Sequence, residues 1–331
     1  MKAPRAILTV LIGACLLLVP IVISNPYWLH IIIMVYLYMV LASSVNIIYG
    51  YTGQLNIGQA GFYAIGAYTT ALLMLDLNAS YWVAMPIAGI LSAIFGVLLG
   101  VPTIRLRGLY LCIATLGFAE VIRLSLLTFD KLTRGPMGLP GIPSPAIGSF
   151  VFGSRASYYY LILAYLLITI FVTYQLVHSR IGKAWIAIRE NETAASAMGI
   201  DTPKYKVLAF SLGAFIAGIA GSFFAVYLTF VSPDSFSMME SYLIFAMPVI
   251  GGMGTIFGPL IGAVILYLLP EVTRDFADYR MLWVSALLAL VVIIEPDGII
   301  GGVKKLMERY RHVSRKTLVA EDNKNVTTPQ S

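Results

Sequence analysis

The chain is poor in charged residues and in the residue types that build most enzyme sites. Of its 331 residues, 11% are charged and 59% are hydrophobic, whereas a soluble domain carries about 25% charged residues. So few charges cannot cover a water-facing surface, which excludes a soluble globular fold. The two cysteines, Cys15 and Cys112, lie in apolar runs, and the three histidines are far apart. This spacing predicts no disulfide, no metal site and no other cofactor.

Motifs for catalysis are also missing. The sequence has no G-x-x-x-x-G-K-[ST] phosphate-binding loop, so the chain is not expected to hydrolyse ATP by itself. No HExxH motif, Ser/His/Asp set or paired-carboxylate cluster stands out. We therefore predict that the chain is not an enzyme.

What the sequence does contain is a series of apolar runs near the ~20 residues that a helix needs to cross a bilayer. We predict an all-α polytopic membrane protein with about 8 to 10 transmembrane helices, some broken or re-entrant. The first run also has features of a signal peptide, but it is long and lacks a small-x-small cleavage site, which favours an uncleaved span. The runs are Ala6–Ser24, Trp28–Tyr49, Gln59–Leu75, Tyr81–Val101, Gly108–Phe129, Tyr158–Val177, Val207–Val231 and Met281–Ile294.

A further apolar stretch, Ser241–Leu269, is interrupted by Pro248 and by the glycines of Gly251–Gly254. We predict that it forms two short arms, either re-entrant segments or brief spans. The run Gly50–Gly61 is punctuated by glycine in a similar way. Paired breaks of this kind can mark the path of a transporter, although two Gly-rich turns could also arise from helix packing alone.

Basic residues orient the predicted spans. With a cytoplasmic N-terminus and alternating spans, sixteen of the 22 Lys and Arg residues fall on the cytoplasmic side and five on the other. This positive-inside split predicts that both termini are cytoplasmic. It also accounts for the net charge of +6, so no nucleic-acid partner is predicted. The predicted organisation is a transmembrane domain at 1–303, containing a cytoplasmic loop at 178–206, and a polar cytoplasmic tail at 304–331.

Loop 178–206 is the only long charged segment between two hydrophobic runs. Its alanine-rich part, Lys183–Met198, predicts one surface helix, and Gly199 is a natural helix stop. Thr202 is predicted to cap the next helix, with Pro203 as its first residue. The loop is either the place where an external protein acts on the membrane domain or an ordinary amphipathic connector.

Polar residues at membrane depth form the first candidate path. Gln54, Asn56 and Gln59 lie within the Gly50–Gly61 break, and irregular backbone at this depth is tolerated only where it is buried or lines a cavity. These amides either line a substrate path or pack the helices by bonding neighbouring groups.

A charged pair inside one predicted span is the second candidate. Glu120 and Arg123 are separated by three residues, so they can face each other on a helix. Ionisable groups at this depth are usually functional or paired. The pair therefore either lines a gate or path, or anchors the helix as a neutralised structural pair.

Over nearly its full length the chain resembles the membrane subunits of branched-chain amino acid ABC importers of the LivM type. The resemblance lies in Asn46–Tyr68, Ala114–Arg123 with Thr133–Pro143, and Ala187–Lys206. It implies a permease in the bilayer of a bacterial inner membrane, paired with a second similar permease. It further implies two cytoplasmic ATPase subunits and a soluble substrate-binding protein, for which loop 130–157 is a docking surface or a plain connector. The implied substrate is a hydrophobic amino acid.

The same resemblance identifies loop 178–206 as the coupling loop that docks into the ATPase. Such loops commonly carry Glu-Ala-Ala-x-x-x-Gly. Here Thr193 occupies the Glu position and Glu192 lies one residue early, which leaves the acidic contact open between Glu190 and Glu192. The predicted contact residues are Arg189, Glu190, Glu192, Ala194, Ala195 and Gly199.

Two other functions remain alternatives at this stage. An ion-coupled secondary transporter would need no ATPase but would need ionisable residues at a midplane site, where Glu120 and Arg123 qualify. An ABC permease for urea or another small solute would share the fold and the coupling loop.

Overall fold

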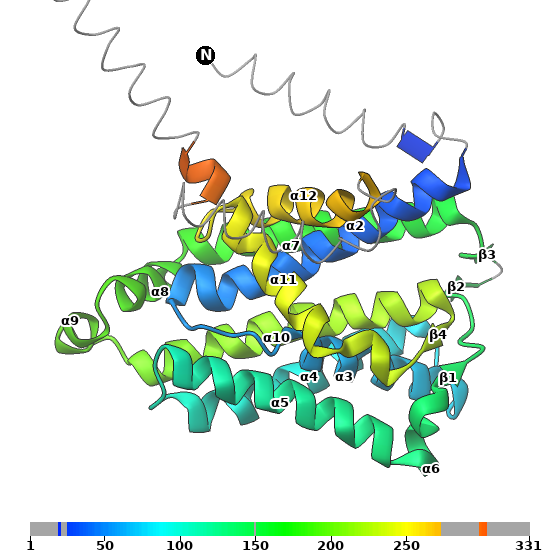
Figure 1. Ribbon diagram of the computed structural model, residues 1–331, viewed down its shortest axis with the longest axis horizontal. Helices are drawn as coiled ribbons and strands as arrows, with labels where there is room; N and C mark the ends of the chain where they lie inside the picture. The colour runs from blue at the N-terminus through cyan, green and yellow to red at the C-terminus, as the bar shows by residue number, and fades with distance from the viewer. Residues whose placement is uncertain (1–18, 21–24, 149, 273–297, 303–331) are drawn as a thin grey trace, which may run out of the picture.

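A computed structural model of the chain (Figure 1) describes residues 19–20, 25–148, 150–272 and 298–302. The predicted span Ala6–Ser24, apart from residues 19–20, lies outside the described residues, as do the predicted span Met281–Ile294 and the tail 304–331. The cytoplasmic placement of both termini therefore stays a prediction.

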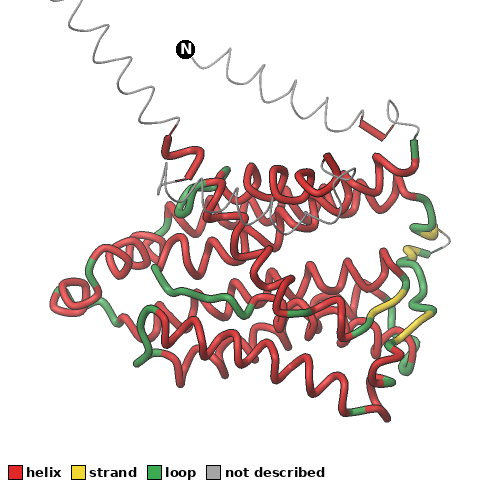
Figure 2. Tube along the Cα trace, viewed as in Figure 1, coloured by secondary structure: helices red, strands yellow, loops and turns green. Residues whose placement is uncertain are grey.

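The described residues are mainly helical, as Figure 2 shows. Two-residue strands pair at one end of the molecule, and a π-helical turn, η1 (Asn46–Gly50), continues the first long helix. Two 3-10 turns are η2 (Gly135–Met137) and η3 (Pro233–Phe236). The α-helices are α2 (Pro26–Val45), α3 (Gln59–Leu75), α4 (Tyr81–Thr103), α5 (Leu109–Thr128), α6 (Asp130–Thr133), α7 (Arg155–His178), α8 (Arg180–Glu190), α9 (Glu192–Ala197), α10 (Thr202–Leu228), α11 (Met238–Gly251) and α12 (Gly258–Val272).

The long helices confirm the predicted all-α polytopic fold. Within the described residues, five helical segments are long and apolar enough to cross a membrane: α2 continued by η1, α4, α5, α7 and α10. Helix α3 coincides with the predicted run Gln59–Leu75 but has only 17 residues. Helices α11 and α12, of 14 and 15 residues, are the two short arms predicted for Ser241–Leu269.

The helices lie lengthwise between two ends of the molecule (Figure 1). The basic end carries loop 178–206 and the turn between α4 and α5, which contains Arg105 and Arg107. The strand end carries α6 and two antiparallel ribbons. These ribbons are β1 (Leu139–Pro140) with β4 (Phe230–Val231), and β2 (Ala146–Ile147) with β3 (Phe150–Val151). The long loop 130–157 is thus ordered by turns and short pairings, as its Gly and Pro content predicts.

Helix α10 packs against α3 and α4 at very short range. A Cβ atom added to Gly66 of α3 would lie 2.1 Å from the carbonyl oxygen of Gly218 in α10. Small residues allow backbones in a membrane bundle to approach this closely. In the apolar 18-residue stretches of α2 with η1 and of α10, 89% and 67% of the residues are buried. In the corresponding stretch of α5 the share is 17%. Helices α2 and α10 therefore form the centre of the bundle, and α5 lies at its periphery.

Gly66→Val should destabilise the fold, because its new side chain meets the backbone of α10 rather than a side chain that can move. We expect a loss of about 2 kcal/mol or more in the free energy of unfolding. Gly117→Val on α5 is the control, since a Cβ there meets nothing within 4 Å. Unfolding of the full chain in detergent measures both, and equal stability of the two variants would contradict this packing.

Candidate coupling site

The loop between α7 and α10 forms two short helices at the basic end, α8 and α9 (Figure 1). Ser179 begins α8, because its Oγ accepts hydrogen bonds from the backbone N–H groups of Ile181 at 3.1 Å and Gly182 at 3.5 Å. A side-chain cap of this kind satisfies N–H groups that have no partner within the helix. The predicted surface helix is present, but its boundaries differ from the prediction.

The single helix predicted over Lys183–Met198 is wrong, because the chain breaks at Asn191. This residue has extended backbone angles, φ −159° and ψ 104°. Its side chain accepts a hydrogen bond from the backbone N–H of Ala194 at 3.0 Å, which caps α9. Asn competes with helical backbone bonding through its own side chain, and this local preference outweighs the helix propensity of the alanines.

The end of the loop confirms one prediction and corrects another. Gly199 has φ +84° and ends the short helix α9, with the N–H of Ile200 bonded to the carbonyl of Ala195 at 3.1 Å, so the predicted stop is confirmed. The predicted cap Thr202 is instead the first residue of α10. Asp201 caps that helix by accepting from the N–H of Lys204 at 3.3 Å, because a carboxylate also interacts favourably with the helix dipole.

Helix α8 is fixed to α10 through its buried face. The side chain of Trp185 is fully buried, and its Nε1 donates to the carbonyl oxygen of Tyr205 at 2.9 Å. Ala184 and Ile188 are buried beside it. Gly182 is buried on the same face, which therefore spans nearly two helical turns and leaves the other side of α8 open.

The open side of the loop contains some of the predicted contact residues but not all of them. Arg189, Glu190, Ala194 and Gly199 are exposed, and Met198 is 84% exposed. Ala195 is only 4% exposed. A bulky side chain at Ala194 would therefore change the surface, whereas one at Ala195 would disturb the packing of the loop itself.

Glu192 faces inward and joins an ion-pair network. Its Oε1 lies 2.5 Å from Nζ of Lys206, and its Oε2 lies 3.1 Å from Nη2 of Arg107. The Lys206 side chain is 7% exposed and that of Glu192 is 22% exposed. A nearly buried ammonium needs such a partner. Glu192 thus connects α9 with α10 and with the turn between α4 and α5.

Arg189 is an exposed residue of α8, but its guanidinium reaches the break that follows α2. Its Nη1 donates to the carbonyl oxygen of Gly50, the last residue of η1, at 2.6 Å. The chain leaves helical geometry here, since Gly53 has φ +72°. The guanidinium therefore supplies a hydrogen-bond donor where the ending helix no longer does.

A cavity of about 240 Å³ lies beside these contacts at the basic end. Its charged lining comes from three cations and two carboxylates, so it is polar and slightly basic. The charged lining residues are Arg107, Arg189, Lys206, Glu190 and Glu192.

The three predicted path amides are buried and hydrogen bonded inside the chain. Gln54 donates to Oγ1 of Thr52 at 2.7 Å, and Asn56 donates to Oε1 of Gln59 at 2.8 Å. Gln59 donates in turn to Oγ of Ser44 at 2.6 Å. These bonds tie the irregular segment between η1 and α3 to its surroundings.

Glu120 and Arg123 form the predicted pair on α5. Nη2 of Arg123 lies 2.5 Å from Oε1 of Glu120, and its Nη1 lies 3.8 Å from Oδ1 of Asp234 in η3. Both paired side chains are 23% exposed. The facing geometry is confirmed, and the contact with η3 adds a third charged group that the sequence did not reveal.

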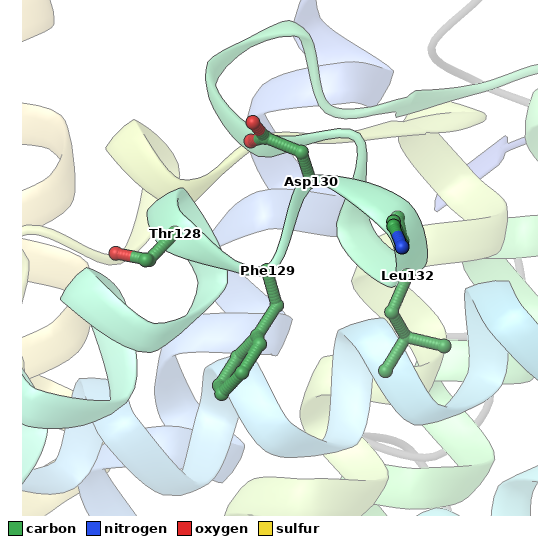
Figure 3. Close-up of a pocket in the computed structure, with 5 residues that line it drawn as sticks. Thr128, Phe129, Asp130 and Leu132 are labelled. Atoms are coloured by element: carbon green, nitrogen blue, oxygen red, sulfur yellow. The ribbon is translucent and has the colours of Figure 1, made fainter.

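At the strand end a cavity of about 510 Å³ lies where α5 gives way to α6. Figure 3 shows that the side chains of Phe129 and Leu132 point to one side of the backbone and the carboxylate of Asp130 to the other. Phe129 and Leu132 are 63% and 57% exposed. This end therefore presents apolar side chains on the predicted outer surface.

Sequence reasoning missed Glu240 as an ionisable residue within the bundle. It accepts a hydrogen bond from Oη of Tyr38 at 2.5 Å. The signal was present, because Ser237 and Glu240 have the S-x-x-E spacing of a helix start before an apolar run. Ser237 does cap α11 by accepting from the N–H of Glu240. The contacts of Lys206 with Glu192 and of Arg123 with Asp234 gave no comparable signal, because the partners lie in different helices.

A bundle of apolar helices with a helix–break–helix loop at its basic end, and no nucleotide-binding motif, defines a membrane permease subunit. The chain belongs to the family described as branched-chain amino acid transport system / permease component, which matches residues 27–295.

Individual relatives agree with this assignment. The high-affinity branched-chain amino acid transport system permease protein LivM of Salmonella typhimurium is 38% identical over 290 residues, covering 81% of this chain and 68% of the relative. LivM of Escherichia coli is also 38% identical, covering 80% and 68%. The permease protein LivH of Salmonella typhimurium is 28% identical, covering 80% of this chain and 91% of the relative. No solved structure matches the chain.

Removing Lys206 should destabilise the basic end, because Glu192 keeps only the exposed Arg107 as its partner. We expect Lys206→Met to cost about 2 kcal/mol, and the double change with Glu192→Gln to recover most of that loss. Equilibrium unfolding of the full chain in mixed micelles measures the coupling. Lys204→Met, at an exposed position, is the control. Strictly additive effects of the two changes would contradict the ion pair.

Proposed function

We propose that this chain is one membrane-spanning subunit of an ATP-driven importer for branched-chain amino acids, in a bacterial inner membrane. The observation that carries the proposal is the 38% identity to LivM permease proteins across four fifths of the chain. The absence of a phosphate-binding loop from the sequence means that ATP is hydrolysed by separate subunits.

The exposed side of α8 and α9 is the proposed contact with a cytoplasmic ATPase subunit. Among the predicted contacts, Arg189, Glu190, Ala194 and Gly199 are exposed, and within the described residues the last three make no side-chain bond to the helix breaks that would withhold them from a partner. Glu192 is engaged with Lys206 and Arg107. This difference favours Glu190 as the acidic contact and gives Glu192 the role of holding the loop in shape.

The exposed face of α5 is the proposed contact with a second, homologous permease. Helix α5 is the least buried of the five candidate spans, and it carries the partly exposed pair Glu120 and Arg123. Charged groups in a bilayer are costly where they face lipid and usually face protein or a water-filled cavity. We therefore place the pair at the boundary between the two permeases, beside the translocation path.

The amides Gln54, Asn56 and Gln59 are proposed to shape the wall of that path rather than to hold the substrate. Each one is satisfied within the chain, so contact with substrate would first require breaking a buried hydrogen bond. Such a loss costs roughly 1–3 kcal/mol for each polar group left unsatisfied.

The strand end is the proposed docking surface for a soluble substrate-binding protein. It presents the cavity beside Phe129 and Leu132, together with exposed Ile147, Phe150 and Val151 of the β2–β3 ribbon. Exposed apolar groups at a water-facing end are typical of protein contacts.

The proposal predicts ATP-driven uptake by the reconstituted complex. The chain, its partner permease and two ATPase subunits in proteoliposomes should import labelled leucine when binding protein is outside and ATP is on the ATPase side. Valine and isoleucine should compete, and urea should not.

Omitting the ATPase subunits is the control that separates the alternatives. Uptake should then fall to the level of empty vesicles even with an ion gradient present. Uptake that persists under these conditions would contradict the proposal and would identify an ion-coupled transporter.

A further inference from the structure

Three segments that are distant in the sequence meet at the basic end. They are the end of α8, the π-helical turn η1, and the turn at residues 252–257 that separates α11 from α12. The turn η1 ends the helical segment that precedes the irregular residues 53–58, and 252–257 is the break between α11 and α12. Helix α8 belongs to the loop that is the proposed ATPase contact. We call this meeting point the junction and define it by Arg189, Asn46, Gly50, Gly254 and Thr255.

Asn46 holds the two breaks together. Its Nδ2 donates to the carbonyl oxygen of Thr255 at 2.8 Å, and its Oδ1 accepts from the N–H of Gly254 at 2.9 Å. One amide side chain therefore satisfies both a donor and an acceptor of the opposite break. Because Asn46 is the first residue of η1, movement of either break is passed to the other.

Arg189 links this pair of breaks to α8. It donates to the carbonyl of Gly50 at the far end of η1, four residues after Asn46. Arg189 also lies one helical turn after Trp185, the residue that fixes α8 to α10. Rotation of α8 about Trp185 would therefore displace the guanidinium and, with it, the end of η1.

The glycines of the junction leave no room for a side chain. A Cβ atom on Gly254 would lie 2.2 Å from Nη1 of Arg189 and 2.9 Å from the carbonyl oxygen of Gly50. A Cβ atom on Gly50 would lie 1.9 Å from Oδ1 of Asn46. Tightly packed groups move together rather than deforming separately, so the guanidinium acts on both breaks at once. A π-helical turn is itself a common feature of functional sites.

We propose that Arg189 is a positioning residue that passes the movement of α8 to the two helix breaks, rather than a contact with the ATPase. This role rests on the proposed function, since it presupposes that an ATPase moves α8. It reassigns a residue that the sequence placed on the docking surface. It also gives the two Gly-rich breaks a common role, because the Arg189 side chain contacts both of them.

The test measures the movement of each segment separately within the assembled importer. One spin label is placed at Lys183 on α8 and another at Phe257 beside α12, each paired with a reference label at Leu77 near the strand end. All three positions are exposed. Cys15 and Cys112 are first replaced by serine. Distances are compared with and without a non-hydrolysable ATP analogue, and uptake is measured in parallel.

In the wild-type complex we expect nucleotide to change the distances from both labels. In Arg189→Gln the change at Lys183 should remain, the change at Phe257 should disappear, and uptake should fall about tenfold, as expected for loss of one coupling interaction. A merely structural role would reduce both distance changes together.

A matched pair of glycine variants tests the same junction with Arg189 intact. Gly254 and Gly53 have nearly equal φ angles, +71° and +72°, so alanine at either position must adopt a positive φ. Only at Gly254 does the new Cβ collide with the guanidinium, since at Gly53 the nearest atom of Arg189 is 3.4 Å away. Gly254→Ala should behave like Arg189→Gln, and Gly53→Ala like the wild type.

The outcomes separate this proposal from the one it rests on. A wild-type complex without ATP-driven uptake would refute the proposed function and this role with it. If the wild type transports but Phe257 does not respond to nucleotide, this role alone is refuted. The same holds if Phe257 responds normally in both Arg189→Gln and Gly254→Ala.

Discussion

Backbone groups that leave a helix inside a bilayer must find hydrogen-bond partners within the protein, because lipid offers none. In this chain the helical backbone is interrupted after Gly50 and again between α11 and α12. At the first interruption, Arg189 donates to the carbonyl of Gly50, and the side chains of Asn56 and Thr115 accept from the N–H groups of Gly58 and Ile57. The second is satisfied by Asn46. Side chains from other segments therefore help to close both breaks, and the proposed transmission of movement runs through those side chains.

The same constraint explains why the coupling loop has two faces with different roles. The inward face supplies Trp185 and Glu192, and the exposed Arg189 reaches the carbonyl of Gly50 from the edge of that face. Each of the three completes a buried or half-buried polar contact. The outward face supplies Glu190 and Ala194, which are exposed. A loop that served only for docking would not need the internal contacts of Trp185, Arg189 and Glu192. A plain connector would not need a side chain that bonds a helix break, as Arg189 does.

Much of the fold could be predicted from the sequence because bilayer thickness sets helix length. The run Gln59–Leu75 was predicted to the residue, and the Gly and Pro residues of Ser241–Leu269 correctly indicated two arms. Local competition was harder to predict. Asn191 interrupts a helix that five alanines favour, and Asp201 displaces Thr202 as a cap. In the first case the side-chain oxygen of Asn191 accepts from the N–H of Ala194, and in the second that of Asp201 accepts from the N–H of Lys204. Each bond starts a helix at a residue that the prediction did not choose.

The site was less predictable than the fold, since its contacts join distant segments. The sequence indicated two Gly-rich breaks but not that Asn46 bridges them. It also did not reveal that Arg189 bonds the carbonyl of Gly50 or that Glu192 pairs with Lys206. The two similar glycine patterns show where the helices break, but only the fold shows that the two breaks lie in contact. The pairing of Arg123 with Asp234 is a further example.

The central claim is that the outward face of α8 and α9 receives the ATPase that drives transport. A photoreactive amino acid incorporated at Ala194 tests this most directly in a complex that retains uptake, with the same probe at Leu77 near the strand end as the control. The account predicts a cross-link to an ATPase subunit from position 194 and none from position 77. Cross-links from position 194 only to lipid or to another permease subunit would contradict it.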